Sequence, residues 1–341
     1  MTTLIAQLSG EHPALAYSEL QSILHILGVT STIERPHSRL ALFNANMDAG
    51  AQLVSRAAYV KMVAECVLSA SLSDVGARGD PRWSELLARA ESFAVRAVRM
   101  GDAPISSMMA EKLVGALIKR AYPHLRVNLS SPSLWVVAFI TRDQLYAGPI
   151  VSRIDSKGFE ERRPGRRPFR HPSAMMPRLA RCMVNLARVR PGGWIIDPFA
   201  GTGSIPIEAA LLGYNLVAIE LKSWIARGCL RNLKHFGLEN STQVICGDAT
   251  RPPLRGRVDA AVTDPPYGRS TQLGGRELHD LYLEAFEALV NLLPKGGRVV
   301  TALPKERFAP EILSYVGLRI IETHPIRVHS GLTRIVCVGA T

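Results

Sequence analysis

The sequence predicts a mixed α/β protein, in which small N-terminal α+β units precede a doubly wound α/β domain. From about residue 193 to the end, strand-like apolar runs alternate with helix-like segments, as a parallel sheet with crossover helices requires. Acidic residues follow successive strands of this region, at the edge where such sheets bind ligands. With 341 residues, the chain is long enough for two or three domains that each bury a core.

The first 150 residues predict two small α+β units, one over residues 1–60 and one over residues 61–150. In the first we expect a strand at 3–8, a helix at 13–27 that ends at Gly28, and a strand at 39–43. In the second we expect strands at 92–99, 127–132, 134–140 and 145–148. Met109, Leu113, Ala116 and Leu117 follow helical spacing and predict a helix between the first two of these strands.

A basic linker is predicted at residues 151–172, and the α/β domain at 173–341. Its strands are expected near 193–197, 215–220, 242–246, 258–263 and 297–302, with a final pair near 317–323 and 333–339. Its helices are expected at 175–186, 204–213, 223–237 and 276–293.

The formal net charge is +12, and most of it is concentrated around the linker. Between Val151 and Arg190 there are eleven basic and three acidic residues, a surplus of eight. Such a cluster is compatible with a solvated face or with biased base composition, but it favours a strip that binds nucleic-acid phosphates. No apolar run approaches the roughly 18–20 residues of a membrane span, so we expect a soluble, cytoplasmic protein. The scattered cysteines and histidines predict no metal site.

The stretch Asp264-Pro265-Pro266-Tyr267 follows the apolar run at 258–262. Two prolines lack N–H donors and have a fixed φ, so they hold the carboxylate before them and the ring after them in a stiff frame. An acceptor beside a stacking ring suits a planar base with an exocyclic amino group, such as adenine, cytosine or guanine. The alternative is an ordinary turn at a strand end, where proline and aspartate are common.

A glycine-bearing loop joins the strand ending at Asp197 to the helix beginning near Ser204. Glycines let a backbone approach a ligand closely, and the helix N-terminus favours an anionic group. The Lys-Ser/Thr of a phosphate loop is missing, and Pro206 replaces the third glycine of a dinucleotide fingerprint. Glu220 lies 17 residues after Gly203, which suits a carboxylate that accepts ribose hydroxyls, and Asp248 ends the next strand.

In this order, these motifs resemble those of class I S-adenosylmethionine-dependent methyltransferases, which have a Rossmann-like domain. The resemblance implies that Asp197, Phe199, Ala200, Gly201, Thr202 and Gly203 hold the methionine part of S-adenosylmethionine. It further implies that Glu220 binds the ribose and that Asp248 with Ala249 binds the adenine. Asp264, Pro265, Pro266 and Tyr267 would form the catalytic signature of the amino-methyltransferases.

Two further resemblances concern the substrate. The strand at 92–96, the helix through Leu117 and the segment 127–148 resemble a THUMP domain, a module of RNA-modification enzymes, although Val114-Gly115 replaces its usual Ile-Gly pair. The preceding residues would form the ferredoxin-like domain that often accompanies it. The segments 167–172, 177–186 and 328–334 resemble those of archaeal tRNA guanine-N2 methyltransferases, above all the family that modifies guanosine 10. The Asp that begins the Asp-Pro-Pro-Tyr signature here, Asp264, agrees with that family.

This resemblance implies tRNA as the partner, and no membrane and no obligatory protein partner are inferred from the sequence. The candidate RNA-contacting residues are Arg166, Arg167, Arg170, His171, His329, Thr333 and Arg334. For the last three, a role in the active site or in a structural hairpin stays open. Two alternatives stay open: an amino-methyltransferase of another target, such as ribosomal guanine or DNA adenine, and a non-catalytic RNA-binding protein. The resemblance implies N2-methylguanosine or N2,N2-dimethylguanosine as the product.

Overall fold

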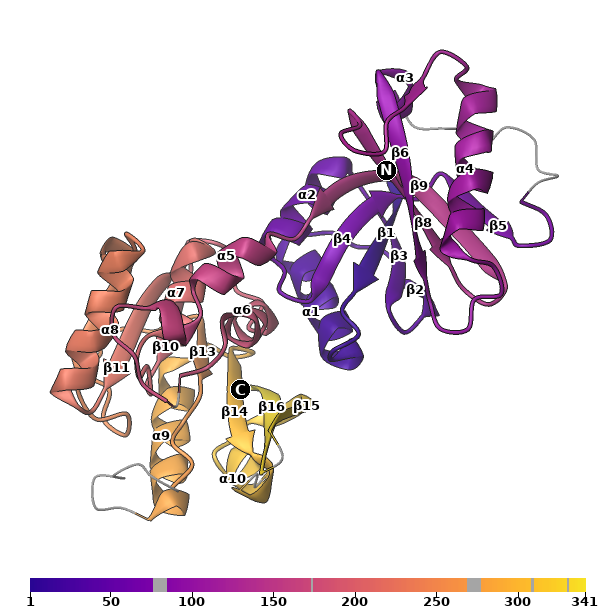
Figure 1. The fold of residues 1–341 in the computed structure, drawn as a ribbon. Coiled ribbons are helices and arrows are strands. Elements are labelled where there is room, and N and C mark those ends of the chain that lie inside the picture. Colours follow the sequence, from indigo (N-terminus) through magenta and orange to yellow (C-terminus); the bar gives the residue numbers. More distant parts are fainter. Residues whose placement is uncertain (76–84, 173, 269–276, 308–309, 330) are drawn as a thin grey trace. The chain divides into compact units, whose positions relative to one another are not determined.

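The computed structural model describes residues 1–75, 85–172, 174–268, 277–307, 310–329 and 331–341. The chain forms two compact units, one of residues 1–20 and 27–154 and one of residues 21–26 and 155–341. Each unit has its own sheet (Figure 1). The change of unit at 154/155 lies inside the predicted linker, and the predicted boundary between residues 60 and 61 stays a prediction.

The first unit is an α+β structure on one sheet. Among its described residues the strand order is β2-β3-β1-β4-β9-β8-β6-β7, with β5 paired to β9. β6 runs parallel to β7 and β8, and the other pairs are antiparallel. The elements up to residue 154 are β1 (Thr2–Leu8), α1 (Pro13–Ile26, of which residues 21–26 are grouped with the second unit), β2 (Glu34–His37), β3 (Leu40–Ala45), α2 (Met47–Arg56), β4 (Val60–Glu65), β5 (Leu68–Ser71), α3 (Glu85–Ala88), β6 (Ser92–Arg99), α4 (Ser107–Ala121), β7 (Arg126–Val127), β8 (Leu134–Ile140) and β9 (Gln144–Arg153).

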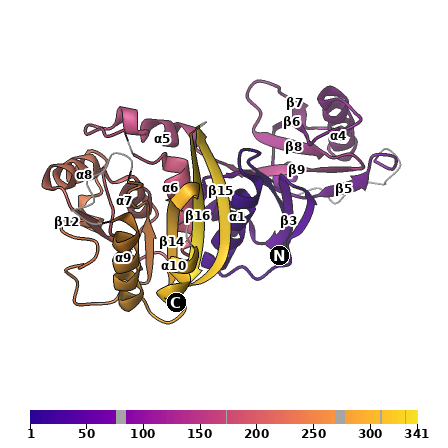
Figure 2. The ribbon, with the colours of Figure 1, turned by 90° about the horizontal axis from the view of Figure 1, so that it is seen from below.

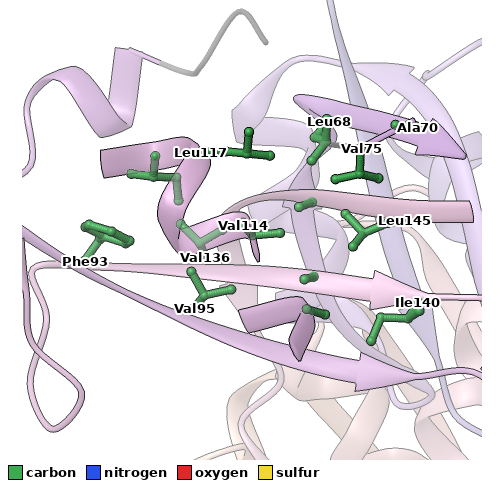
Figure 3. Close-up of a cluster of buried hydrophobic side chains, with 14 of the residues drawn as sticks. Leu68, Ala70, Val75, Phe93, Val95, Val114, Leu117, Val136, Ile140 and Leu145 are labelled. Carbon is green, nitrogen blue, oxygen red and sulfur yellow. The ribbon is translucent and has the colours of Figure 1, made fainter. Parts of the chain in front are cut away.

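Helix α4 covers one face of β6, β8 and β9 and closes a buried apolar core. Val114 and Leu117, three residues apart, lie on the helix face that meets Phe93, Val95 and Val136 (Figure 3). The Ser106 hydroxyl accepts a hydrogen bond from the Met109 amide and caps the helix start.

The strand predicted at 127–132 is wrong in length, because β7 ends at Val127. The Asn128 side chain accepts hydrogen bonds from the amides of Ser130 and Ser131, at 3.2 and 3.1 Å. This local turn competes with pairing to the neighbouring strand and ends it.

The second unit has the alternating architecture that the sequence predicts. Its described strands form a sheet in the order β12-β11-β10-β13-β14-β16-β15, parallel from β12 to β14 and antiparallel beyond. Figure 2 shows β14, β16 and β15 side by side. The helices and strands are α5 (Ser156–Glu161), α6 (Pro177–Leu186), β10 (Trp194–Asp197), α7 (Ser204–Leu211), β11 (Asn215–Glu220), α8 (Ser223–His235), β12 (Thr242–Cys246), β13 (Ala260–Thr263), α9 (Leu278–Leu292), β14 (Arg298–Pro304), α10 (Pro310–Tyr315), β15 (Arg319–His329) and β16 (Leu332–Ala340).

Helices cover both faces of this sheet. Ile245 of β12 belongs to the core that α9 and α10 close, whereas its neighbour Val244 packs with residues of α7 and α8. Because successive side chains of a strand point to opposite faces, the two helix sets lie on opposite sides. Among the described helices, none is both long enough and apolar enough to cross a membrane.

Candidate functional site

The carboxyl ends of three parallel strands bring the predicted acids together. β10 lies between β11 and β13, and it ends at Asp197 while β11 ends at Glu220. Asp264 directly follows the last residue of β13. Thr263, the residue before Asp264, hydrogen-bonds Asp197, and Gly201 of the loop after Asp197 hydrogen-bonds Glu220, so the three carboxylates lie at one edge of the sheet.

The glycine loop between β10 and α7 is organised by Glu220. One oxygen of its carboxylate accepts a hydrogen bond from the Gly201 amide at 3.1 Å, and the other accepts from the Lys222 amide at 2.9 Å. Gly201 and Gly203 have φ of +51° and +88°, a region that L side chains rarely adopt. A Cβ on Gly203 would lie 2.9 Å from the Cys229 sulfur, so the loop packs directly on α8.

Asp197 connects the loop to the neighbouring strand. Its carboxylate accepts hydrogen bonds from the Thr263 hydroxyl at 2.8 Å and from the Phe199 amide at 3.2 Å. Burial raises the pKa of Asp197 to about 7, against the lowering effect of these two bonds. Asp248 instead shapes its own turn, accepting from the amide and the hydroxyl of Thr250, each at 2.9 Å.

The Asp264 to Tyr267 loop lies at the same sheet edge. The side chain of Asp264 is 15% exposed, and one of its oxygens accepts a hydrogen bond from the Tyr267 hydroxyl. The other oxygen lies 3.5 Å from the guanidinium of Arg334. From α9, the Tyr282 hydroxyl donates to the Pro266 carbonyl at 2.6 Å and fixes the middle of the loop.

The electrostatics of this loop are balanced around the carboxylate. Burial raises the pKa of Asp264, whereas Arg334 and the hydrogen bond from Tyr267 lower it. The pKa of the Tyr267 phenol is raised, first by burial and then by the negative charge of Asp264. At neutral pH the Tyr267 hydroxyl therefore keeps its proton and acts as a donor.

The linker arginines do not all face solvent, which corrects one predicted RNA contact. Arg167 is 1% exposed, and its guanidinium donates to the Ser204 hydroxyl at 2.9 Å and to the Arg162 carbonyl at 2.9 Å. Arg162 and Arg181 both pair with the fully buried Glu208 of α7, each at 2.7 Å. Arg162 and Arg167 anchor the linker, and Arg181 anchors α6, to the helix that follows the glycine loop, so the charges of these three arginines are engaged inside the unit.

The other predicted RNA-contacting residues lie in varied surroundings. Arg166 and Arg170 are exposed, and His171 lies against the half-exposed Trp224 at 6.1 Å between ring centroids. Thr333 is half-buried on β16. The side chain of His329 lies outside the described residues. Arg334, for which the sequence left an RNA contact or an active-site role open, contacts Asp264.

Several residues of the site carry no signal in the sequence. Asn232 of α8 is fully buried. Its side-chain oxygen accepts a hydrogen bond from the Phe169 amide, and its side-chain nitrogen donates to the carbonyls of Phe169 and Thr202. Tyr282 of α9 fixes the Asp264 to Tyr267 loop through the Pro266 carbonyl. Both lie inside helices with no motif around them, and only the packing of the chain shows their partners.

Comparison with known proteins identifies the family. Residues 164–335 match the RMKL-like methyltransferase domain family, and residues 81–147 match the THUMP domain family. The sequence is 35% identical to the tRNA (guanine(10)-N2)-dimethyltransferase of Methanothermobacter thermautotrophicus, with 97% of each chain covered. It is 36% identical to the Pyrococcus abyssi enzyme of the same name over 74% of each chain. The chain belongs to the tRNA guanine-N2 methyltransferase family.

Solved structures agree at the level of the fold. The structure of TrmN from Thermus thermophilus matches with a TM-score of 0.59 and 23% identity, covering 99% of both chains. SMU.472, solved as a complex with SAH, matches with a TM-score of 0.54 and 14% identity over 98% of this chain and 97% of that one. The predicted fold class, a Rossmann-like methyltransferase domain preceded by a THUMP domain, is confirmed.

Proposed function

We propose that this methyltransferase transfers a methyl group from S-adenosylmethionine to the N2 atom of guanosine 10 in tRNA, in the cytoplasm. The observation that carries the proposal is the convergence of Asp264 and Tyr267 with the loop at 197–203 and Glu220 on one sheet edge. The tRNA (guanine(10)-N2)-dimethyltransferases to which the chain is similar over most of its length support the position within tRNA.

The residues present fit S-adenosylmethionine. Gly201 and Gly203 have no side chains and lead into the N-terminus of α7, so the backbone is open to the methionine part of a ligand. Glu220 would hold the ribose and Asp248 the adenine. When bound, the cofactor supplies a methyl group on a positively charged sulfur.

The target guanine must leave its helix, at a cost of a few kcal/mol. Stacking on Tyr267 returns about 1–3 kcal/mol of that cost. The N2 lone pair of guanine is delocalised into the ring, so the free amino group is a poor nucleophile. The Asp264 carboxylate and the Pro265 carbonyl would each accept a hydrogen bond from one N–H of the guanine amino group. These hydrogen bonds would favour a pyramidal amino group, whose lone pair points at the methyl group.

The linker and the THUMP domain would deliver the tRNA. The exposed Arg166 and Arg170 fit phosphate contacts, whereas Arg162, Arg167 and Arg181 are engaged within the unit. We therefore assign RNA contacts to the exposed part of the basic strip only.

The proposal is tested by incubating unmodified tRNA with the protein and S-adenosylmethionine and locating the added mass by nucleoside and fragment mass spectrometry. N2-methylguanosine or N2,N2-dimethylguanosine in the fragment with position 10 is expected. Asp264→Ala should abolish transfer while binding of S-adenosylmethionine, measured by calorimetry, is largely preserved. A mass increment at another tRNA position, or only with ribosomal RNA or DNA, would overturn the substrate assignment. Failure to bind the cofactor would favour a non-catalytic RNA-binding protein.

A further inference from the structure

Arg334 is a charged residue in an unusual place. It lies on β16, opposite Pro304 of β14 and Ile326 of β15, and it is 8% exposed. Its Nε atom is buried and has no hydrogen-bond partner within the described residues. Burying a guanidinium costs free energy unless it is paired. A compensating interaction is therefore expected, and the structure places it at the catalytic loop.

Arg334, Asp264 and Tyr267 contact one another pairwise. The Arg334 guanidinium is 3.5 Å from one oxygen of Asp264 and lies over the Tyr267 ring, 5.4 Å from its centroid. The Tyr267 hydroxyl donates to the other oxygen of Asp264. One arginine thus contacts both groups that would handle the base, the carboxylate by charge and the ring by a cation–π contact.

We propose that Arg334 is a positioning residue for methyl transfer, which holds the Asp264 carboxylate as an ionised acceptor and keeps the Tyr267 ring beside it. The proposal rests on the proposed function of this site. Arg334 forms an ion pair with one oxygen of the Asp264 carboxylate, and the Tyr267 hydroxyl donates a hydrogen bond to the other. The incoming amino group then replaces that hydroxyl as donor, so one hydrogen bond to Asp264 is exchanged for another.

The charges around Asp264 support this role. Within the part of the chain that the structure describes, Arg334 on β16 is the cation that acts on Asp264, and Tyr267 contributes a hydrogen bond. The negative charge of Asp264 and that of Asp197 on β10 repel each other, and Tyr282 on α9 interacts electrostatically with Tyr267. Without Arg334, burial would favour the neutral carboxylic acid, which would present an O–H donor to an amino group that itself donates.

The test compares Arg334→Gln and Arg334→Lys with the wild-type protein on unmodified tRNA, with kcat and KM measured from pH 5.5 to 9. Arg334→Gln should lower kcat at pH 7 about 100-fold, the effect of misplacing a reacting group. The acid limb of its kcat profile should move to higher pH, and KM for tRNA should change little. Arg334→Lys keeps the charge but not the planar group, so its acid limb should stay near that of the wild type while kcat falls. Arg319→Gln, at the exposed far end of β15, is the matched control and should leave kcat unchanged.

A second readout is independent of the substrate. In protein labelled with carboxyl-¹³C aspartate, with the Asp264 signal assigned from Asp264→Asn, the Asp264 titration should move to higher pH in Arg334→Gln. Unchanged acid limbs in both Arg334 variants, together with an unchanged Asp264 titration, would overturn the inference. A loss confined to KM for tRNA would also overturn it, because that result describes a phosphate contact. An inactive wild-type protein would refute the proposed function alone, since the titration still tests Arg334.

Discussion

The buried cluster around Glu208 gives the sharpest stability prediction. Its carboxylate is fully buried and pairs with Arg162 and Arg181, each at 2.7 Å. Glu208→Gln keeps the shape but removes the negative charge, which leaves two engaged guanidinium groups without a counter-ion. Removal of one partner from a buried pair costs about 3–5 kcal/mol. At the lower figure, and at about 2–4 °C per kcal/mol for a unit of this size, Tm falls by about 6–12 °C.

The assay is scanning calorimetry of the full chain. The transition of the second unit is identified by its rise in Tm when S-adenosylmethionine is added. Glu160→Gln is the matched control, since Glu160 pairs with Arg163 at 2.9 Å with side chains about half exposed (48% and 51%). Such a pair is worth about 0–1 kcal/mol, so Tm should hardly move. Equal Tm shifts in Glu208→Gln and Glu160→Gln would refute the argument that burial makes the Glu208 cluster costly to break.

A further test separates charge from packing. Arg181→Gln combined with Glu208→Gln removes one of the two uncompensated cations. The double variant should therefore lose less Tm than the sum of the two single variants. If the Tm loss of the double variant equals the sum of the two single losses, Arg181 and Glu208 are not energetically coupled.

Three further predictions concern the site and the RNA. Tyr267→Phe and Tyr267→Trp should retain more methyl transfer than Tyr267→Ala, since stacking needs the ring; equal kcat/KM losses in all three would contradict stacking. Affinity for tRNA should fall steeply between 50 and 200 mM salt in filter binding, and a flat response would exclude a phosphate-dominated interface. Burial raises the pKa of Asp197 to about 7, above its unfolded value, so its contribution to stability is present at low pH and is lost as pH rises through about 7. The side chain of Asp197→Asn stays neutral at every pH. The Tm of this variant minus the Tm of the wild type should therefore be more positive at pH 8 than at pH 5, and a difference that does not change with pH would refute the predicted direction.

Most strands and helices of the second unit were predictable because their signals are local, although the short helices α5 and α10 were not expected. The β10 to α7 segment shows an apolar run, a glycine loop and a helix start in consecutive residues, and the structure places β10 at Trp194–Asp197 and α7 at Ser204–Leu211. The first unit was predicted less completely. Helix α2 was not expected, because Gly50 and few large apolar residues weaken its pattern, although Asn46 caps its start.

The linker shows why charge patterns alone mislead. Arginine-rich sequence has the same composition whether its side chains face solvent or a buried acid. The Arg167 side chain points inward, where the Ser204 hydroxyl and the Arg162 carbonyl accept its hydrogen bonds. Arg162 and Arg181 point inward because both form ion pairs with Glu208. Glu208 itself stands in the middle of a helix, 46 residues from Arg162, and no local signal connects the two.

The sequence by itself determined the order of chemistry along the chain: a glycine loop, acids at strand ends, and an Asp-Pro-Pro-Tyr turn. Strands that run parallel have their carboxyl ends at the same edge of the sheet, so a local pattern of strands and helices suffices to predict that these groups meet. Only the tertiary structure decided which charges face them. The antiparallel pairing of β16 with β14 and β15 places Arg334 beside Asp264, and a residue 70 positions away in the chain has no local signal that predicts this contact.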